Sequence, residues 1–131
     1  MTVLVDTSAL YALLARDDQN HEAAAAAFSG LRHRGPLVTH NYVVVETVAL
    51  VQHRFGMSVV RTLLDLLGPI QVIWVDEETH RAALAALLAA PRRRLSLVDR
   101  VSFEVMRERG ITQAFAFDPD FAQEGFVTVT S

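Results

Sequence analysis

The chain has 131 residues, about half of them apolar, and a formal net charge of −3. This length suits one domain with its own core, and the lack of cysteine excludes disulfides, thiolate metal sites and cysteine nucleophiles. The negative charge argues against a generally basic nucleic-acid-binding surface, although a local groove depends on where the charges lie.

The apolar stretches are too short, or too interrupted by charge, for the roughly 20 residues of a membrane helix. Met1 leads directly into the apolar segment Val3–Val5, with no basic region before it. The beginning of the sequence therefore predicts a first core strand and not a secretory signal. We expect a cytoplasmic protein without a membrane helix.

Strand and helix patterns alternate along the whole sequence, separated by capping residues, glycines and prolines. The predicted strands are 2–5, 37–39, 70–75, 114–117 and 126–129. The predicted helices are 9–14, 20–32 with Asn20 as cap, 41–55, 58–67 with Ser58 as cap, 76–90 with Asp76 as cap, and 96–109 with Ser96 as cap. Valines in the first half of 41–55 are poor helix formers, so a strand is the alternative there. The alternation predicts a single α/β domain over residues 1–131, with a mostly parallel sheet covered by helices on both faces.

Three aspartates stand at positions where a catalytic and a structural role are both reasonable. Asp6 and Asp118 follow predicted strands, and ligands of open parallel sheets bind at the carboxyl ends of strands. Each could instead cap a helix or turn, Asp118 through the sequence Asp118-Pro119. Asp99 stands three residues after Ser96, which is the spacing of a capping box.

Glu46 is the single charged residue in a segment of mostly apolar residues between His40 and His53. A carboxylate buried without a partner costs several kcal/mol or becomes neutral, so it must reach solvent, an arginine or a cation. We favour a role at a functional site. The alternative is a position at the rim beside Arg54 or Arg61.

Four motifs in chain order resemble those of the PIN-domain family, most closely the VapC-type toxin nucleases of bacterial toxin-antitoxin pairs. The motifs are Val3-Leu4-Val5-Asp6-Thr7-Ser8-Ala9-Leu10, Thr39 through Asn41 to Glu46, Leu95 through Asp99 to Ile111, and Phe117-Asp118-Pro119-Asp120-Phe121 with Glu124-Gly125-Phe126. The resemblance spans nearly the whole chain.

The resemblance implies a three-layer α/β/α fold with a five-stranded sheet, and a nuclease that hydrolyses RNA phosphodiester bonds. By the same resemblance, Asp6, Asp99 and Asp118 are expected to bind Mg²⁺ or Mn²⁺, with Glu46 as a ligand through water or as the residue that orients the attacking water. Such ions prefer oxygen ligands and relieve the repulsion between clustered carboxylates. Thr7 or Ser8 is expected to hydrogen-bond a metal ligand.

All twelve basic residues are arginines. The codon bias of a GC-rich genome would explain this preference, and so would phosphate binding, for which guanidinium groups are well suited. The candidates for RNA contact are Arg92, Arg93, Arg94 and Arg100, although a solvated loop after Pro91 is the alternative for any one of them. Arg100 stands where the family leads us to expect a small residue. Tyr11 and Tyr42 are candidates for base stacking, or for the core.

Other classes of protein fit less well. Receiver and haloacid-dehalogenase-type domains use a lysine that this chain lacks, and its five histidines do not have the spacing of a zinc hydrolase. A non-catalytic α/β binding module, with acids that only cap helices, is the main alternative outside the enzymes. Among enzymes, the alternative to a toxin is a housekeeping RNA-processing PIN nuclease without an antitoxin. If the protein is a toxin, the resemblance implies a homodimer and a cognate antitoxin that enters the acidic groove.

Overall fold

A fully parallel sheet lies at the centre of the computed structural model, which describes residues 1–90 and 95–130. Its strand order is β3-β2-β1-β4-β5. The bounds are β1 Val3–Val5, β2 Leu37–His40, β3 Gln71–Ile73, β4 Gln113–Phe115 and β5 Val127–Thr128. In register, Val3 pairs with Leu37 on one side and with Gln113 on the other. The predicted α/β class with a five-stranded parallel sheet is therefore confirmed.

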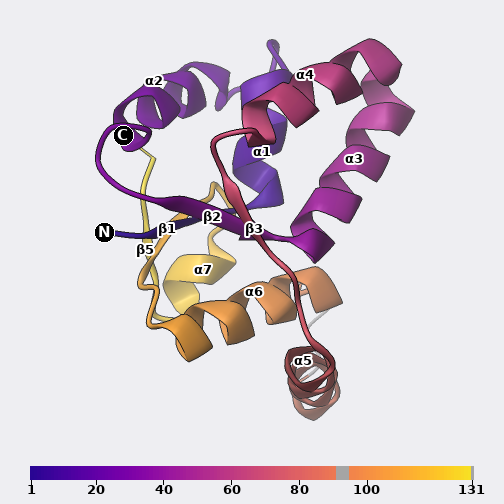
Figure 1. Cartoon of the computed structure of the whole chain (residues 1–131), viewed down its shortest axis with the longest axis vertical. Helices are drawn as coiled ribbons and strands as arrows, with labels where there is room; N and C mark the ends of the chain where they lie inside the picture. Colours follow the sequence, from indigo (N-terminus) through magenta and orange to yellow (C-terminus); the bar gives the residue numbers. More distant parts are fainter. Residues whose placement is uncertain (91–94, 131) are drawn as a thin grey trace.

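Helices cover both faces of this sheet (Figure 1). Their bounds are α1 Thr7–Leu14, α2 His21–Leu31, α3 Asn41–Phe55, α4 Met57–Leu67, α5 Glu77–Ala89, α6 Leu97–Arg109 and α7 Asp120–Gln123. Helices α1 to α4 lie on one side, α6 and α7 lie on the other, and α5 packs beside α6. None of the helices in the described residues is long and apolar enough to cross a membrane.

The central strand β1 is buried on both faces, as its unbroken apolar sequence predicts. Val3 and Val5 pack in a core formed with α1 to α4, whereas Leu4 points into a second core formed with α5, α6 and α7. All three side chains are at most 3 % exposed. Burial of each contributes about 1.5–3 kcal/mol to folding, so the position of the residue that follows β1 is firmly set.

The connection between α3 and α4 differs from the prediction that Ser58 caps the second helix. Gly56 ends α3 and begins α4, with a φ of 88° that residues other than glycine rarely adopt. The two helices are thus joined by one residue, and Ser58 lies inside the first turn of α4. Asn20 precedes α2 as predicted, but its side chain makes no capping hydrogen bond.

The predicted buried strand 70–75 is shorter and more exposed than expected. Strand β3 covers Gln71–Ile73 at the edge of the sheet, and Trp74 is 77 % exposed. By contrast, the valine-rich segment after Asn41 is helical throughout. The His40 side chain accepts a hydrogen bond from the Val43 backbone (3.3 Å) and so caps this helix.

Candidate active site

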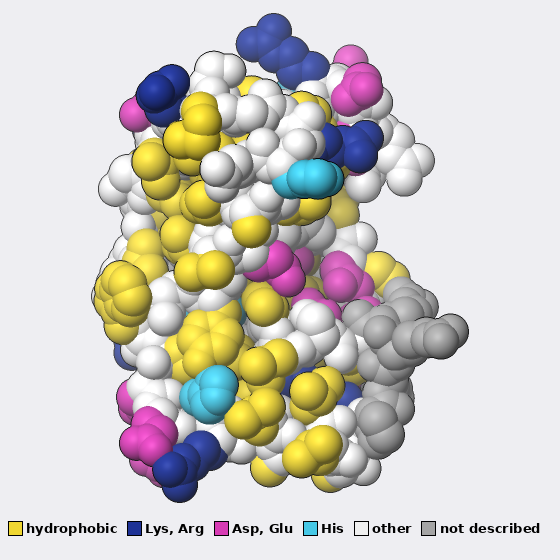
Figure 2. Space-filling view, turned by 90° about the vertical axis from the view of Figure 1, so that its right-hand side faces the viewer, with side chains coloured by type: hydrophobic (Ala, Val, Ile, Leu, Met, Phe, Trp, Pro, Cys, Tyr) yellow, Lys and Arg dark blue, Asp and Glu magenta, His cyan; other side chains and the backbone are white. Residues whose placement is uncertain are grey.

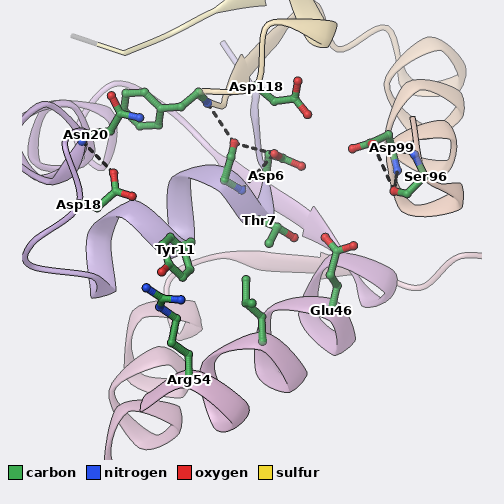
Figure 3. Close-up of a pocket in the computed structure, with 13 residues that line it drawn as sticks. Asp6, Thr7, Tyr11, Asp18, Asn20, Glu46, Arg54, Ser96, Asp99 and Asp118 are labelled. Carbon is green, nitrogen blue, oxygen red and sulfur yellow. Dashed lines mark hydrogen bonds between the residues drawn. The ribbon is translucent and has the colours of Figure 1, made fainter. Parts of the chain in front are cut away.

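The four predicted acids line one pocket at the carboxyl end of the sheet (Figure 3). Asp6 follows β1, Asp118 follows β4, Asp99 lies in the first turn of α6, and Glu46 lies on α3. The pocket has a volume of about 530 Å³. On the surface, acidic side chains gather in a hollow near the middle of one face (Figure 2). β1 and β4 are neighbours whose helices cover opposite faces, which is where parallel sheets bind ligands.

Asp6 is the most deeply buried of these acids, at 4 % exposure. It caps α1, because its Oδ2 accepts hydrogen bonds from the Ser8 backbone (3.1 Å) and from the Ser8 hydroxyl (2.7 Å). Burial raises the pKa of Asp6 to about 6, against these hydrogen bonds, and the charges of Asp99 and Asp118 add to the rise. The ionised form is therefore costly here unless a positive charge compensates it.

The two hydroxyl residues that follow Asp6, Thr7 and Ser8, make different contacts. The Ser8 hydroxyl accepts a hydrogen bond from the Phe117 backbone (3.0 Å), so it ties α1 to the segment after β4 that carries Asp118. Thr7 does not contact Asp6 by a hydrogen bond within the described residues, but its hydroxyl lies 3.1 Å from that of Thr47. Thr47 is buried on α3 next to Glu46, and sequence reasoning did not select it.

Asp99 forms the capping box that its spacing from Ser96 predicts. Its Oδ2 accepts hydrogen bonds from the Ser96 backbone (2.9 Å) and hydroxyl (3.1 Å), and the Asp99 backbone donates to the Ser96 hydroxyl (3.2 Å). Burial raises the pKa of Asp99, the bonds from Ser96 lower it, and Asp120 raises it further. The capping role therefore accompanies a position in the pocket and does not exclude it.

Asp118 also has a local structural role, since its Oδ1 accepts a hydrogen bond from the Asp120 backbone (2.9 Å) before α7. Burial raises the pKa of Asp118, and the side chain of Asp120 and the charge of Asp99 add to the rise. Asp120 itself is 5 % exposed and does not line the pocket, but it raises the pKa of both Asp99 and Asp118; sequence reasoning did not select it. Its spacing of two residues from Asp118 was the available signal.

Asp6 and Asp99 share a pattern that bears on metal binding. Each uses a single carboxylate oxygen for its cap, and the other oxygen has no hydrogen-bond partner among the described residues. Oxygen donors without partners, in acids with raised pKa, fit a hard cation such as Mg²⁺. However, no group of three or more acidic or histidine side chains in the described part of the chain is arranged to hold a metal ion. In Figure 3 the Asp99 carboxylate is directed towards Ser96.

Glu46 is half-buried on the wall of the pocket that α3 forms. Within residues 1–90 and 95–130 it makes no ion pair with Arg54 or Arg61, although Arg54 lines the same pocket. The Glu46 carboxylate is left to face the pocket, across from Asp6 and Asp118 (Figure 3).

Comparison with known proteins agrees with this geometry. The family model of the PIN domain matches residues 3–126. The chain belongs to the PIN-domain family.

The chain is also similar to a curated endonuclease and to solved structures. It is 35% identical over 130 residues, 97% of each chain, to the "23S rRNA-specific endonuclease VapC20" of Mycobacterium tuberculosis strains CDC 1551 and H37Rv. The crystal structure of M. tuberculosis VapC20, described as a sarcin-ricin loop cleaving toxin, matches with a TM-score of 0.86 and 32% identity over 95% of this chain and 96% of that one. VapBC2 from Rickettsia felis, solved with a promoter DNA fragment, shares the fold alone: its TM-score is 0.71 at 10% identity, over 98% and 97% of the two chains.

Arg100 is one of the four arginines predicted to contact RNA. Its side chain is buried, its Nη2 donates to the Ala90 carbonyl oxygen (2.7 Å), and its Nη1 lies 3.9 Å from Glu124 Oε1. Arg100 thus holds the end of α5 and the end of α7 against α6, and these contacts argue for a structural role; RNA contact by Arg100 stays a prediction. The other three candidates, Arg92, Arg93 and Arg94, lie outside the described residues.

The two tyrosines differ in their position. Tyr11 lines the pocket of the four acids. Tyr42 does not, and its hydroxyl is hydrogen-bonded to His80 Nδ1. Of these two rings, therefore, only Tyr11 is placed to meet a ligand in this pocket.

Replacement of Ser8 by alanine is expected to lower the free energy of unfolding of this PIN domain by about 1–2 kcal/mol. The change removes a donor to Asp6 and leaves the partly buried Phe117 N–H without its acceptor. Urea unfolding monitored by circular dichroism measures this loss. Ser29→Ala, on an exposed position of α2, is the matched control and should be neutral or slightly stabilising. Equal stability of S8A and wild type would contradict the role given to Ser8.

Proposed function

We propose that this PIN domain is a metal-dependent endoribonuclease and the toxin of a toxin-antitoxin pair. The observation that carries the proposal is that Asp6, Glu46, Asp99 and Asp118, from four different elements, line one pocket. Identity of 35% to VapC20 over 97% of both chains supports the same class of activity. Because VapC20 is described as specific for 23S rRNA, we propose ribosomal RNA as the substrate, which places its action in the cytoplasm.

In this proposal, Asp6, Asp99 and Asp118 would hold Mg²⁺, or Mn²⁺, through their carboxylate oxygens. The cation would neutralise negative charge on the phosphate and make a nearby water more acidic. Glu46 would orient a water molecule for attack in line with the leaving oxygen. The water oxygen bonds to phosphorus as the bond to the leaving oxygen breaks, and a proton passes from the water to solvent or a carboxylate while the leaving oxygen is protonated. Ser8 holds Asp6 in place through its hydroxyl.

A cognate antitoxin and a second copy of the chain are the protein partners that we propose. The similarity of the chain to VapC20, which is described as a toxin, supports the proposal of an antitoxin. Exposed apolar side chains, including Val45 at 68%, Trp74 at 77% and Leu88 at 79%, provide surface for protein contacts. Light scattering of the purified chain, with and without the antitoxin, measures both.

We expect the protein to cleave 23S rRNA in the presence of Mg²⁺ or Mn²⁺. Cleavage should stop when EDTA is added and return when the metal is restored in excess. The physical reason is that clustered carboxylates repel a phosphate unless a cation compensates them. Gel analysis of full-length 23S rRNA and of an unrelated structured RNA measures the activity and its selectivity. Isothermal titration calorimetry with Mn²⁺ is the second readout. No cleavage of any RNA together with no metal binding would overturn the proposal and favour a binding module.

A further inference from the structure

The pocket extends well beyond the four acids along one face of α3. Glu46, Leu50 and Arg54 are spaced four residues apart, so they lie on the same side of this helix. All three line the pocket. Eight residues of helix separate Glu46 from Arg54, which is about 12 Å along the axis. The pocket is therefore longer than a single phosphate group and has room for a length of nucleic-acid strand.

The end of the pocket distant from Asp99 has a different character. Tyr11 and Arg54 lie near each other there, at the opposite side of the pocket from the acids at Asp99 and Asp118 (Figure 3). The Tyr11 ring packs against Phe55 with 5.9 Å between centroids, and the Arg54 guanidinium lies over the same Phe55 ring at 5.9 Å. The aromatic contact limits the movement of both side chains, so the tyrosine face and the guanidinium group are presented together.

Arg54 is the one basic residue among the described residues that line this pocket. It is exposed and makes no ion pair in the part of the chain that the structure describes. The acid at this end, Asp18, accepts a hydrogen bond from the Asn20 backbone (2.8 Å). The guanidinium group of Arg54 is therefore available for an anion from solution.

We propose that Arg54 and Tyr11 form a subsite for single-stranded RNA, in which Arg54 binds a phosphate next to the scissile one along the strand and Tyr11 stacks on a base. The inference rests on the proposed nuclease function and adds to it the part of the site that holds the substrate strand. Guanidinium groups bind phosphate oxygens in pairs. Unpaired bases stack on aromatic side chains, whereas the bases of a duplex are not accessible in this way. Leu50 and Phe117 add apolar side chains to the lining of the pocket.

Binding to a fluorescent single-stranded RNA tests the subsite, with Asp6→Asn as the background so that the RNA stays intact. Anisotropy titrations at several salt concentrations give the affinity and its salt dependence. Adding R54Q should weaken binding roughly 10-fold and reduce the slope of log affinity against log salt by about 0.7, the contribution of one phosphate contact on a single strand. Y11L should weaken binding by about 10-fold, while Y11F, which keeps the ring, should leave it unchanged.

Arg61→Gln is the matched control, because Arg61 is an exposed arginine on α4 that does not line the pocket. It changes the net charge by the same amount as R54Q. If R54Q has the affinity and salt slope of R61Q, or if no variant binds RNA in a salt-dependent way, the subsite is overturned. Cleavage of RNA by the wild type is measured separately, and failure to cleave would overturn the nuclease proposal. If the wild type cleaves RNA but R54Q binds RNA with the same affinity and salt slope as R61Q, only the subsite is overturned.

Discussion

Asp6→Asn is expected to lower the rate of RNA cleavage by roughly 1,000-fold or more. Asparagine keeps an oxygen that can accept the hydrogen bonds from Ser8, so the cap of α1 is preserved. It lacks the negative charge that the proposed cation site requires, and the loss of a ligand to a catalytic metal costs several kcal/mol of transition-state stabilisation. Initial rates on 23S rRNA with Mg²⁺ measure the effect.

The control for this experiment is Asp17→Asn, which makes the same chemical change at an exposed position outside the pocket. It should cleave at the wild-type rate. A D6N variant that cleaves as fast as D17N would remove Asp6 from the active site and would leave the capping of α1 as its role.

The same substitution is expected to stabilise the metal-free protein at neutral pH. Burial raises the pKa of Asp6 from 3.8 to about 6, so the folded protein binds a proton more tightly than the unfolded chain does. The free energy of unfolding therefore falls as the pH rises from about 4 to 6, and the full cost, about 3 kcal/mol, is present above pH 6. The asparagine side chain of D6N would not carry this cost, since it is never ionised.

Urea unfolding in EDTA at pH 7.5 and at pH 4 measures this difference. D6N should be more stable than the wild type by up to about 3 kcal/mol at pH 7.5, and the difference should shrink towards zero at pH 4. Mg²⁺ should stabilise the wild type and have little effect on D6N. A D6N variant that is less stable than the wild type at both pH values would show that the charge of Asp6 is not costly in the folded protein.

The sequence predicted the fold well because the chain obeys simple local rules. Apolar strands lead into polar residues, and caps such as Ser96 and Asp76 begin the helices where their spacing indicates. The order of the strands could not be read in the same way, since it depends on contacts between distant segments. For this reason the edge position of β3, and with it the exposure of Trp74, was not predicted.

The pocket shows the same division between local and distant contacts. The strand ends placed Asp6 and Asp118 correctly, and the structural alternative of helix capping proved compatible with a place in the pocket. The structural contacts of Arg100 were not predicted, because its partners, Ala90 and Glu124, are not its neighbours in the sequence. Thr47 was not selected because nothing in the sequence shows that its hydroxyl meets that of Thr7, which is 40 residues away.

The order of the strands also determines when this site can exist during synthesis of the protein. β1 pairs with β4 in the sheet, yet Asp6 is synthesised well before Asp118 and the strand that precedes it. At about 5–20 residues per second, many seconds pass between the synthesis of these two aspartates. Until Asp118 has been made, the nascent chain lacks one of the four acids of the pocket, and a partially synthesised chain on the ribosome cannot carry out the chemistry of the finished one.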